Sequence, residues 1–173
     1  NISKDKLEDC INSDLANNFG NFCQRVTAFA EKNCNNKIPG PIDLKEKDKE
    51  ILNNFVNNID NLRINIDEQN LNSYVEFIVN SLFDANKYFN DEAPWNKKDN
   101  KNRLNSIIYT SLELIRKISI LLYPIIPESS LKSLKIFNIK ENEISFRTIA
   151  NNNFLVSNTE IFKIGILFKK ILK

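Results

Sequence analysis

Apolar residues recur along this chain at the spacing of a helix face. The clearest run in the first part of the chain is Leu15, Phe19, Phe22, Val26 and Phe29. These residues are separated by four, three, four and three positions, which places them on one side of a helix with 3.6 residues per turn. Pro39, Gly40 and Pro41 then interrupt any helix. The pattern therefore predicts a first long helix over about 5–32, followed by a loop.

The same periodicity continues through most of the chain. It predicts helices over the ranges 44–62, 70–90 and 102–123, and a shorter helix over 128–137. Pro94 ends the third of these helices, and Pro124 and Pro127 separate the last two. The helix over 102–123 is the most apolar, so we expect it at the centre of the core. Amphipathic helices with short connections predict an all-α fold, an antiparallel bundle of four to five helices.

The C-terminal part of the chain is less regular. Residues 139–173 mix short apolar runs with a turn signal at Asn152 and Asn153, and we predict a final helix over Thr159–Leu172. We therefore divide the chain into a helical bundle, 1–138, and a C-terminal extension, 139–173. The polar start without methionine suggests a piece of a longer protein. The extension is expected to pack on the bundle or on a domain outside this sequence.

The residue types present argue against catalysis. Histidine is absent, which removes the commonest general base and the commonest metal ligand. Cys10, Cys23 and Cys34 are widely spaced without a CxxC pair, which favours reduced thiols in a cytoplasm over disulfides or a metal site. Acidic residues fall mostly on the polar faces of the predicted helices, which argues against an enzyme built inside the bundle. We expect no catalytic residue, metal or cofactor in this chain.

Charge and hydropathy narrow the range of partners. The net charge of +2 and the pI near 8.4 are only mildly basic, so any binding of nucleic acid must depend on local contacts. No apolar run approaches the roughly 20 residues that cross a bilayer, which predicts a protein outside the membrane.

One polar face of the first helix suits a base of single-stranded nucleic acid. Asn21 and Arg25 are four residues apart, so they are stacked on one side of the helix, away from the apolar stripe. An amide reads both donors and acceptors on a base edge, and a guanidinium binds a base or a phosphate. The alternative interpretation is an ordinary solvated helix face.

The only tryptophan follows a proline at the end of the third helix. Pro94 restricts the backbone and holds the Trp95 indole in a defined direction. A ring held in this way is a platform on which a base can stack. Four basic residues that follow are candidate phosphate contacts: Lys97, Lys98, Lys101 and Arg103. The alternative interpretation is a tryptophan that closes the end of the core.

These two stretches, in this order, resemble the anticodon-binding domain of bacterial methionyl-tRNA synthetases, which are class I aminoacyl-tRNA synthetases. That family carries a DLANxxGNxxxR helix start and an APW turn after a long helix, here Asp14–Arg25 and Ala93–Trp95. The segment 122–129, LYPIIPES, is similar to the PxxPE segment of the family. The resemblance spans residues 9–139.

The resemblance implies roles for particular residues. Trp95 would stack on the cytidine that opens the CAU anticodon, Asn21 and Arg25 would hydrogen-bond anticodon bases, and Pro94 would shape the contact. The implied partners are methionine and initiator tRNAs and the chain's own catalytic domain. That domain, with its HIGH and KMSKS signatures, would bind ATP and methionine and charge the tRNA in the cytoplasm. The present chain has neither signature, so we expect it to be the non-catalytic part of a ligase.

Two other interpretations remain open. The DLAN and PxxPE elements occur more loosely in other class I synthetases, so the chain also fits an anticodon-binding domain of one of those enzymes. A helical protein-interaction module, with Trp95 as the anchor, is the alternative from a different class. Anticodon binding should weaken with salt and require a specific loop, whereas a protein partner would be indifferent to RNA.

Overall fold

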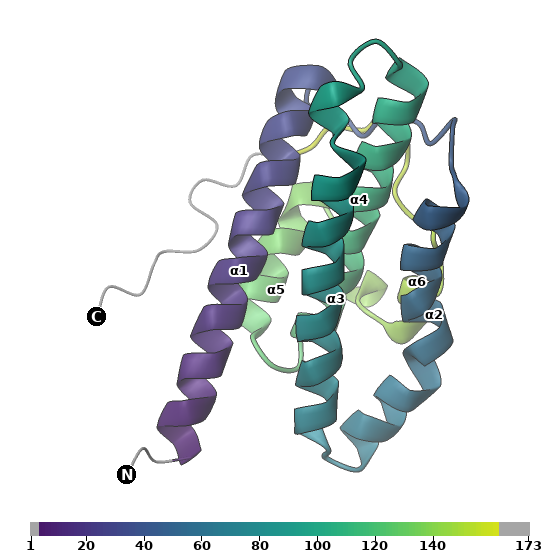
Figure 1. The fold of residues 1–173 in the computed structure, drawn as a ribbon. Helices are drawn as coiled ribbons and strands as arrows, with labels where there is room; N and C mark the ends of the chain where they lie inside the picture. Colours follow the sequence, from purple (N-terminus) through teal and green to yellow (C-terminus); the bar gives the residue numbers. More distant parts are fainter. Residues whose placement is uncertain (1–3, 163–173) are drawn as a thin grey trace.

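The computed structural model describes residues 4–162, apart from the side chains of residues 4, 7, 8 and 10, and this part of the chain is helical (Figure 1). Four long helices run alternately up and down the molecule: α1 (Lys4–Asn33), α2 (Glu46–Asp67), α3 (Leu71–Glu92) and α4 (Lys101–Leu122). The predicted all-α antiparallel bundle is confirmed. Within residues 4–162, no helix is both long and apolar enough to cross a lipid bilayer.

Shorter elements complete the described chain. They are η1 (Pro94–Asn96), α5 (Pro127–Leu134), η2 (Lys135–Phe137), η3 (Glu141–Glu143) and α6 (Phe146–Ile149). The short helix predicted over 128–137 is thus α5 continued by η2. Residues 159–162 are not helical, because residues 159–161 pair with the loop that follows α1 and the N–H of Phe162 donates to the carbonyl of Ile136. The helix predicted from Thr159 therefore does not begin there, and the rest of that prediction lies outside the described residues.

The helix boundaries follow from residues that accept or tolerate special backbone geometry. The side chains of Asn70 and Asn100 accept hydrogen bonds from the third residue beyond them and so cap the starts of α3 and α4. Asn35 and Asn36, which follow the end of α1 after one intervening residue, both have positive φ angles, a conformation that asparagine tolerates better than most residues. Asparagines therefore act as boundary residues for three of the long helices.

Helix α4 is the centre of the molecule. Every residue from Ser106 to Leu122 is buried, as expected for the most apolar helix, because α1, α2, α3, α5 and α6 all contact α4. Polar residues in this buried stretch are satisfied locally: the hydroxyls of Thr110, Ser111 and Ser119 donate to carbonyls four residues earlier. From Ser106 onward, α4 therefore has no side exposed to solvent.

A buried ion pair on α4 holds the segment 139–162 on the bundle. One oxygen of Glu113 accepts hydrogen bonds from the backbone N–H groups of Phe154 and Leu155, at 2.6 and 3.0 Å. The other oxygen accepts from Nε of Arg116 at 2.6 Å, and Arg116 in turn donates to backbone carbonyls of Thr148 and Asn151. The expectation that carboxylates stay on exposed faces is wrong for Glu113, because the returning segment supplies its partners.

Lys117 is a second charged group inside this contact. Its side chain is buried, Nζ donates to the backbone carbonyl of Ile149, and the ammonium lies 6.0 Å from the centre of the Phe55 ring. Burial, and then repulsion from Arg116, lower the pKa of Lys117 from 10.5 to about 7. In the folded protein this lysine therefore loses its proton far more readily than in the unfolded chain.

This shift predicts a pH dependence of stability. Between about pH 7 and pH 10.5 the unfolded chain binds more protons at Lys117 than the folded chain, so the free energy of unfolding rises with pH. Lys117→Met, which keeps the length of the side chain without the charge, should flatten this rise. Urea unfolding of both proteins at several pH values within this window, from about pH 7 to pH 10, measures the difference. Equal slopes for the two proteins would show that Lys117 does not titrate in this range.

Candidate nucleic-acid interface

The turn after α3 holds the tryptophan at the end of the bundle. Ala93 ends α3 in the left-handed conformation, with φ 43° and ψ 67°, which costs an L-residue roughly 1–2 kcal/mol. Pro94 is buried and opens η1, and the backbone N–H of Asn96 closes the turn on the carbonyl of Ala93 at 2.9 Å. The Trp95 side chain is 41% exposed. The turn thus fixes the indole between the core and the solvent.

An aromatic cluster supports the indole from beneath. The ring of Phe89 lies 5.7 Å from that of Trp95 in an edge contact, and Phe89 is only 2% exposed. Phe22 and Phe29 of α1 meet Phe89 edge-on at 6.3 and 6.4 Å. Such edge contacts each contribute about 0.5–1.5 kcal/mol beyond the buried area. Trp95 is therefore held on one side and available to solvent on the other.

Arg25 reaches the same cluster from α1. Its guanidinium carbon lies 5.1 Å from the centre of the Phe89 ring, a cation–π contact. One nitrogen donates to the side-chain oxygen of Asn90 at 2.6 Å, and the other to that of Asn86 at 3.4 Å. The structure thus brings Arg25 and Trp95, 70 positions apart in the sequence, into contact with the same phenylalanine.

Asn21 lies one turn before Arg25 on α1, and its side chain is exposed. The amide is therefore accessible on the helix face that also presents the guanidinium. Asn21, Arg25 and Trp95 are all exposed, whereas Pro94 is buried beneath the turn. Pro94 accordingly acts through the backbone that it restricts.

The residues that orient Arg25 were not among the candidates predicted from the sequence. Asn86 and Asn90 are four positions apart on α3, so they share the face that meets α1. Phe89 lies between them in the sequence and is one of the apolar residues of the helix predicted over 70–90. The available signal was the amide pair at helical spacing just before the Ala-Pro-Trp turn.

The basic residues after Trp95 occupy different environments. Nζ of Lys97 donates to the carbonyl of Glu92 at 3.0 Å and so helps to cap α3. Nζ of Lys101 donates to the carbonyl of Asn33, the last residue of α1, also at 3.0 Å. Both Lys98 and Lys101 are exposed, and Lys97 is half-buried.

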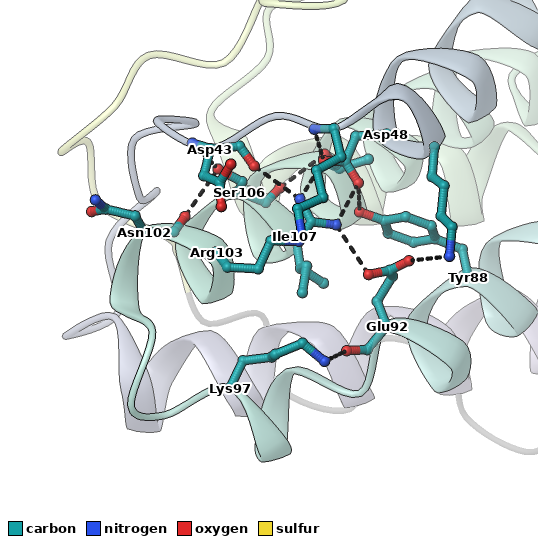
Figure 2. A network of polar contacts seen from close by, with 12 residues as sticks. Asp43, Asp48, Tyr88, Glu92, Lys97, Asn102, Arg103, Ser106 and Ile107 are labelled. Carbon is teal, nitrogen blue, oxygen red and sulfur yellow. Dashed lines mark hydrogen bonds and ion pairs between the residues drawn. The ribbon is translucent and has the colours of Figure 1, made fainter.

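Arg103 is buried, so the phosphate contact predicted for it is wrong. Its side chain is 1% exposed and binds the carboxylate of Asp48 through two nitrogens, at 2.6 and 3.0 Å (Figure 2). A further contact of 3.0 Å joins it to Glu92. These carboxylates already neutralise the guanidinium, which therefore has no side turned to an RNA phosphate.

Asp48 is the buried centre of this network. Besides Arg103, it accepts hydrogen bonds from the Tyr88 hydroxyl at 2.5 Å and from the backbone N–H of Lys45 at 2.9 Å. Burial on its own would raise the pKa of Asp48, but the hydrogen bonds from Arg103, Tyr88 and Lys45 outweigh it and lower the pKa below its usual value. The carboxylate therefore stays charged at neutral pH.

The network positions the tryptophan turn. Asp48 belongs to the start of α2, Tyr88 and Glu92 to the end of α3, and Arg103 to the start of α4. Glu92 is the last residue of α3 and directly precedes Ala93. Figure 2 shows that its side chain faces Arg103 while Lys97 reaches its backbone carbonyl. The ends of three helices are thus fixed where the chain turns toward Trp95.

This end of the molecule offers binding groups rather than reactive ones. An exposed ring, a guanidinium and amides suit stacking and hydrogen bonding to a base. Among the described residues, no group of three or more Cys, Asp or Glu side chains is arranged to hold a metal ion.

Comparisons with known proteins give the family of this chain. The family described as "Anticodon binding domain of methionyl tRNA ligase" matches residues 38–173. The chain is 33% identical to the methionine–tRNA ligase of Rickettsia conorii and 31% identical to that of Thermotoga maritima. Each alignment covers 98% of this chain and therefore includes α1, but only 34% and 27% of the relative. The chain thus spans about a third of the length of these relatives.

Solved structures agree with this similarity. The free-state methionyl-tRNA synthetase of Mycobacterium tuberculosis superimposes with a TM-score of 0.85 at 27% identity, over 99% of this chain and 35% of that one. The same enzyme with methionyl-adenylate gives a TM-score of 0.82 at 28% identity. The similarity therefore extends over nearly the whole chain.

Asp48→Asn should destabilise the fold strongly, because it leaves Arg103 buried with one carboxylate fewer. We expect the free energy of unfolding to fall by about 3–5 kcal/mol in urea unfolding. Asp91→Asn, which removes the same charge from the exposed pair of Lys87 and Asp91, should have no measurable effect. A small loss for both variants would mean that the buried network contributes little to the fold.

Trp95→Ala and Phe89→Ala should differ in their effect on stability. Phe89 is buried, so its truncation should cost about 3–5 kcal/mol. Trp95 is 41% exposed, so its truncation should lower the free energy of unfolding by only about 1–2 kcal/mol, mainly through the lost contact with Phe89. Thermal and urea unfolding of both variants give these values. If the Trp95→Ala variant were unfolded under native conditions, the indole would instead be shown to be part of the core.

Proposed function

Because this chain belongs to the family of methionyl-tRNA ligase anticodon-binding domains, we propose that it binds the CAU anticodon of methionine and initiator tRNAs. The observation that carries the proposal is the half-exposed indole of Trp95, held against Phe89, with Arg25 in contact with the same ring. A fixed aromatic surface beside a hydrogen-bonding cation is the combination that binds an unstacked base.

Each exposed group has a distinct role in this proposal. Trp95 stacks on the first anticodon base, a cytidine. Arg25 uses two of its five N–H donors on Asn86 and Asn90, which leaves the remaining donors for base edges or phosphate. The amide of Asn21 reads a neighbouring base edge, and Pro94 holds the turn. Lys97 and Lys98 lie close in sequence to the ring and are proposed as weaker phosphate contacts.

The wider activity is proposed for the whole ligase. In the proposal this chain is its non-catalytic anticodon-reading part, and the remaining part charges the tRNA with methionine. ATP and methionine bind that remaining part, and the present chain needs no cofactor of its own. The free thiols of Cys23 and Cys34 support a cytoplasmic location, where cysteines stay reduced.

Fluorescence of Trp95, the only tryptophan, tests the proposal directly. A CAU anticodon stem-loop should quench the indole, and a stem-loop that differs only in the first anticodon base should bind more weakly. Arg25→Gln should weaken binding of the CAU loop by about tenfold, since a hydrogen bond from a charged group contributes about 1.5–3 kcal/mol. Its thermal stability should change much less.

Arg63→Gln is the matched control, because Arg63 also lies over an aromatic ring, that of Phe146, but on α2. It should bind the CAU loop as the unchanged protein does. Equal quenching by both loops would mean that binding depends on nonspecific charge attraction and not on the anticodon sequence. No response to either loop would favour a protein-interaction module.

A further inference from the structure

A cleft lined by both polar and apolar residues opens at the same end of the bundle as Trp95. Its volume is about 470 Å³, within the range of about 300–1,000 Å³ that is usual for ligand sites. Its walls come from three separate parts of the chain: the loop after α1, the start of α4, and residues 157–158 of the C-terminal segment. The anticodon-contact residues proposed above on α1 and η1 do not line it.

The lining of the cleft is basic and amide-rich. Lys37 and Lys101 approach from different walls, and both are exposed. Asn105 and Asn158 add amides that both donate and accept hydrogen bonds. No aspartate or glutamate is among the described residues that line it. Glu160 pairs with Lys37 through a backbone bridge but does not line the cleft. The described lining, with two lysines and no carboxylate, therefore favours an anion.

The cysteine in the cleft does not oppose an anion. Cys34 lies on the wall formed by the loop after α1. Burial raises the pKa of its thiol, so it remains neutral at physiological pH.

The cleft continues the surface that carries Arg25 and Trp95. Arg25, Phe29 and Asn33 follow one another at four-residue steps on one face of α1. Phe29 packs on Phe89 beneath the indole, and the carbonyl of Asn33 accepts the hydrogen bond from Lys101 at the cleft. Figure 1 shows the end of α1, the turn after α3 and the start of α4 together at this end of the molecule.

The spacing fits a nucleic-acid strand. Asn33 lies eight positions after Arg25, which is about 12 Å along a helix axis. Stacked nucleotides advance about 3.4 Å each, so this span corresponds to three or four nucleotides. A loop whose first anticodon base lies on Trp95 would therefore carry its neighbouring nucleotides toward the cleft.

We propose that the cleft binds the phosphodiester backbone of loop nucleotides that flank the base on Trp95, with Lys37 and Lys101 as the phosphate contacts. Lys101 was a candidate from its position after Trp95, whereas Lys37 is 64 positions away from it and is placed beside it only by the fold. The inference rests on the proposed function. It adds a second contact region that holds RNA by charge and does not read its sequence.

Salt dependence separates a phosphate contact from a structural role. Lys37→Gln should weaken binding of the CAU stem-loop by about three- to tenfold at low salt. It should also reduce the slope of the logarithm of affinity against the logarithm of salt concentration by about 0.7, the value for one phosphate of a single strand. Lys49→Gln, the same charge change at an exposed position of α2, should alter neither quantity. Trp95 fluorescence reports binding in each case.

Lys101→Gln should give the same two changes. Since this variant also loses the bond to the Asn33 carbonyl, its thermal unfolding must be measured alongside. A lower melting temperature with an unchanged salt slope would assign Lys101 to structure alone and would overturn its part of the proposal. An unchanged salt slope for Lys37→Gln as well would overturn the proposal as a whole.

Shorter probes locate the contact on the RNA. The trinucleotide CAU lacks the flanking backbone, so Lys37→Gln and the unchanged protein should bind it equally. A loss of affinity for the trinucleotide as large as for the stem-loop would place Lys37 at the anticodon itself and contradict the proposal. Inorganic phosphate at matched ionic strength should compete no better than chloride. Stronger competition would make the cleft a general anion site and not an RNA site.

Cys34 provides a measurement that needs no substitution. A saturating stem-loop should slow the reaction of Cys34 with a thiol reagent, followed by mass spectrometry of its peptide. Full reactivity of Cys34 while Trp95 is quenched would refute the cleft contact and leave the proposed function intact. Absence of any Trp95 response to the stem-loop would overturn the proposed function and this inference with it.

Discussion

The buried charge of Arg103 is the constraint on which this end of the molecule depends. A guanidinium removed from water is tolerated only if carboxylates and carbonyls surround it. Here Asp48 supplies two contacts, Glu92 a third, and the backbone carbonyl of Asp43 a fourth. Because these groups belong to α2, α3, α4 and the loop before α2, satisfying one charge fixes where all four segments meet.

The candidate interface follows from that junction. Glu92 is held by Arg103, and the next residue, Ala93, takes a left-handed conformation that an unconstrained chain would avoid. The strained turn directs Pro94 inward and leaves Trp95 half-exposed over Phe89. Arg25 then reaches the same phenylalanine from α1. A chain with a net charge of only +2 can in this way present stacking and hydrogen-bonding groups at one place without being basic overall.

A second buried network holds the C-terminal segment that reaches the same end of the bundle. Glu113 and Arg116 bind the backbone of residues 148–155, and the chain then continues to the loop after α1. The backbone of Ile38 pairs there with Asn158 and Thr159. The wall of the cleft that carries Asn158 is therefore placed by ionic contacts made near the middle of α4. Both proposed RNA contacts thus depend on buried charges of the bundle.

The helices, their approximate order and the central position of α4 were predictable from the sequence, because apolar spacing alone decides which face of a helix avoids water. The sequence also identified Asn21, Arg25 and Trp95 as candidates, since their motifs are local. The burial of Arg103 was not predictable, although one sign was present: Asp48 continues the stripe Leu52, Phe55, Ile59 and Leu62 at helical spacing. A charged residue on an apolar stripe predicts a buried partner but does not say which one.

Contacts between distant positions were decided only by the tertiary structure. Arg103 was predicted to bind phosphate because it follows other basic residues, and the fold places it against Asp48, 55 positions away. Likewise Asn86 and Asn90 orient Arg25, and Lys37 faces the cleft beside Lys101, only because α1, α3 and α4 pack together. Hydrophobic periodicity is a property of neighbouring residues and can be read along the chain, whereas the pairing of charges depends on which helix ends meet in space.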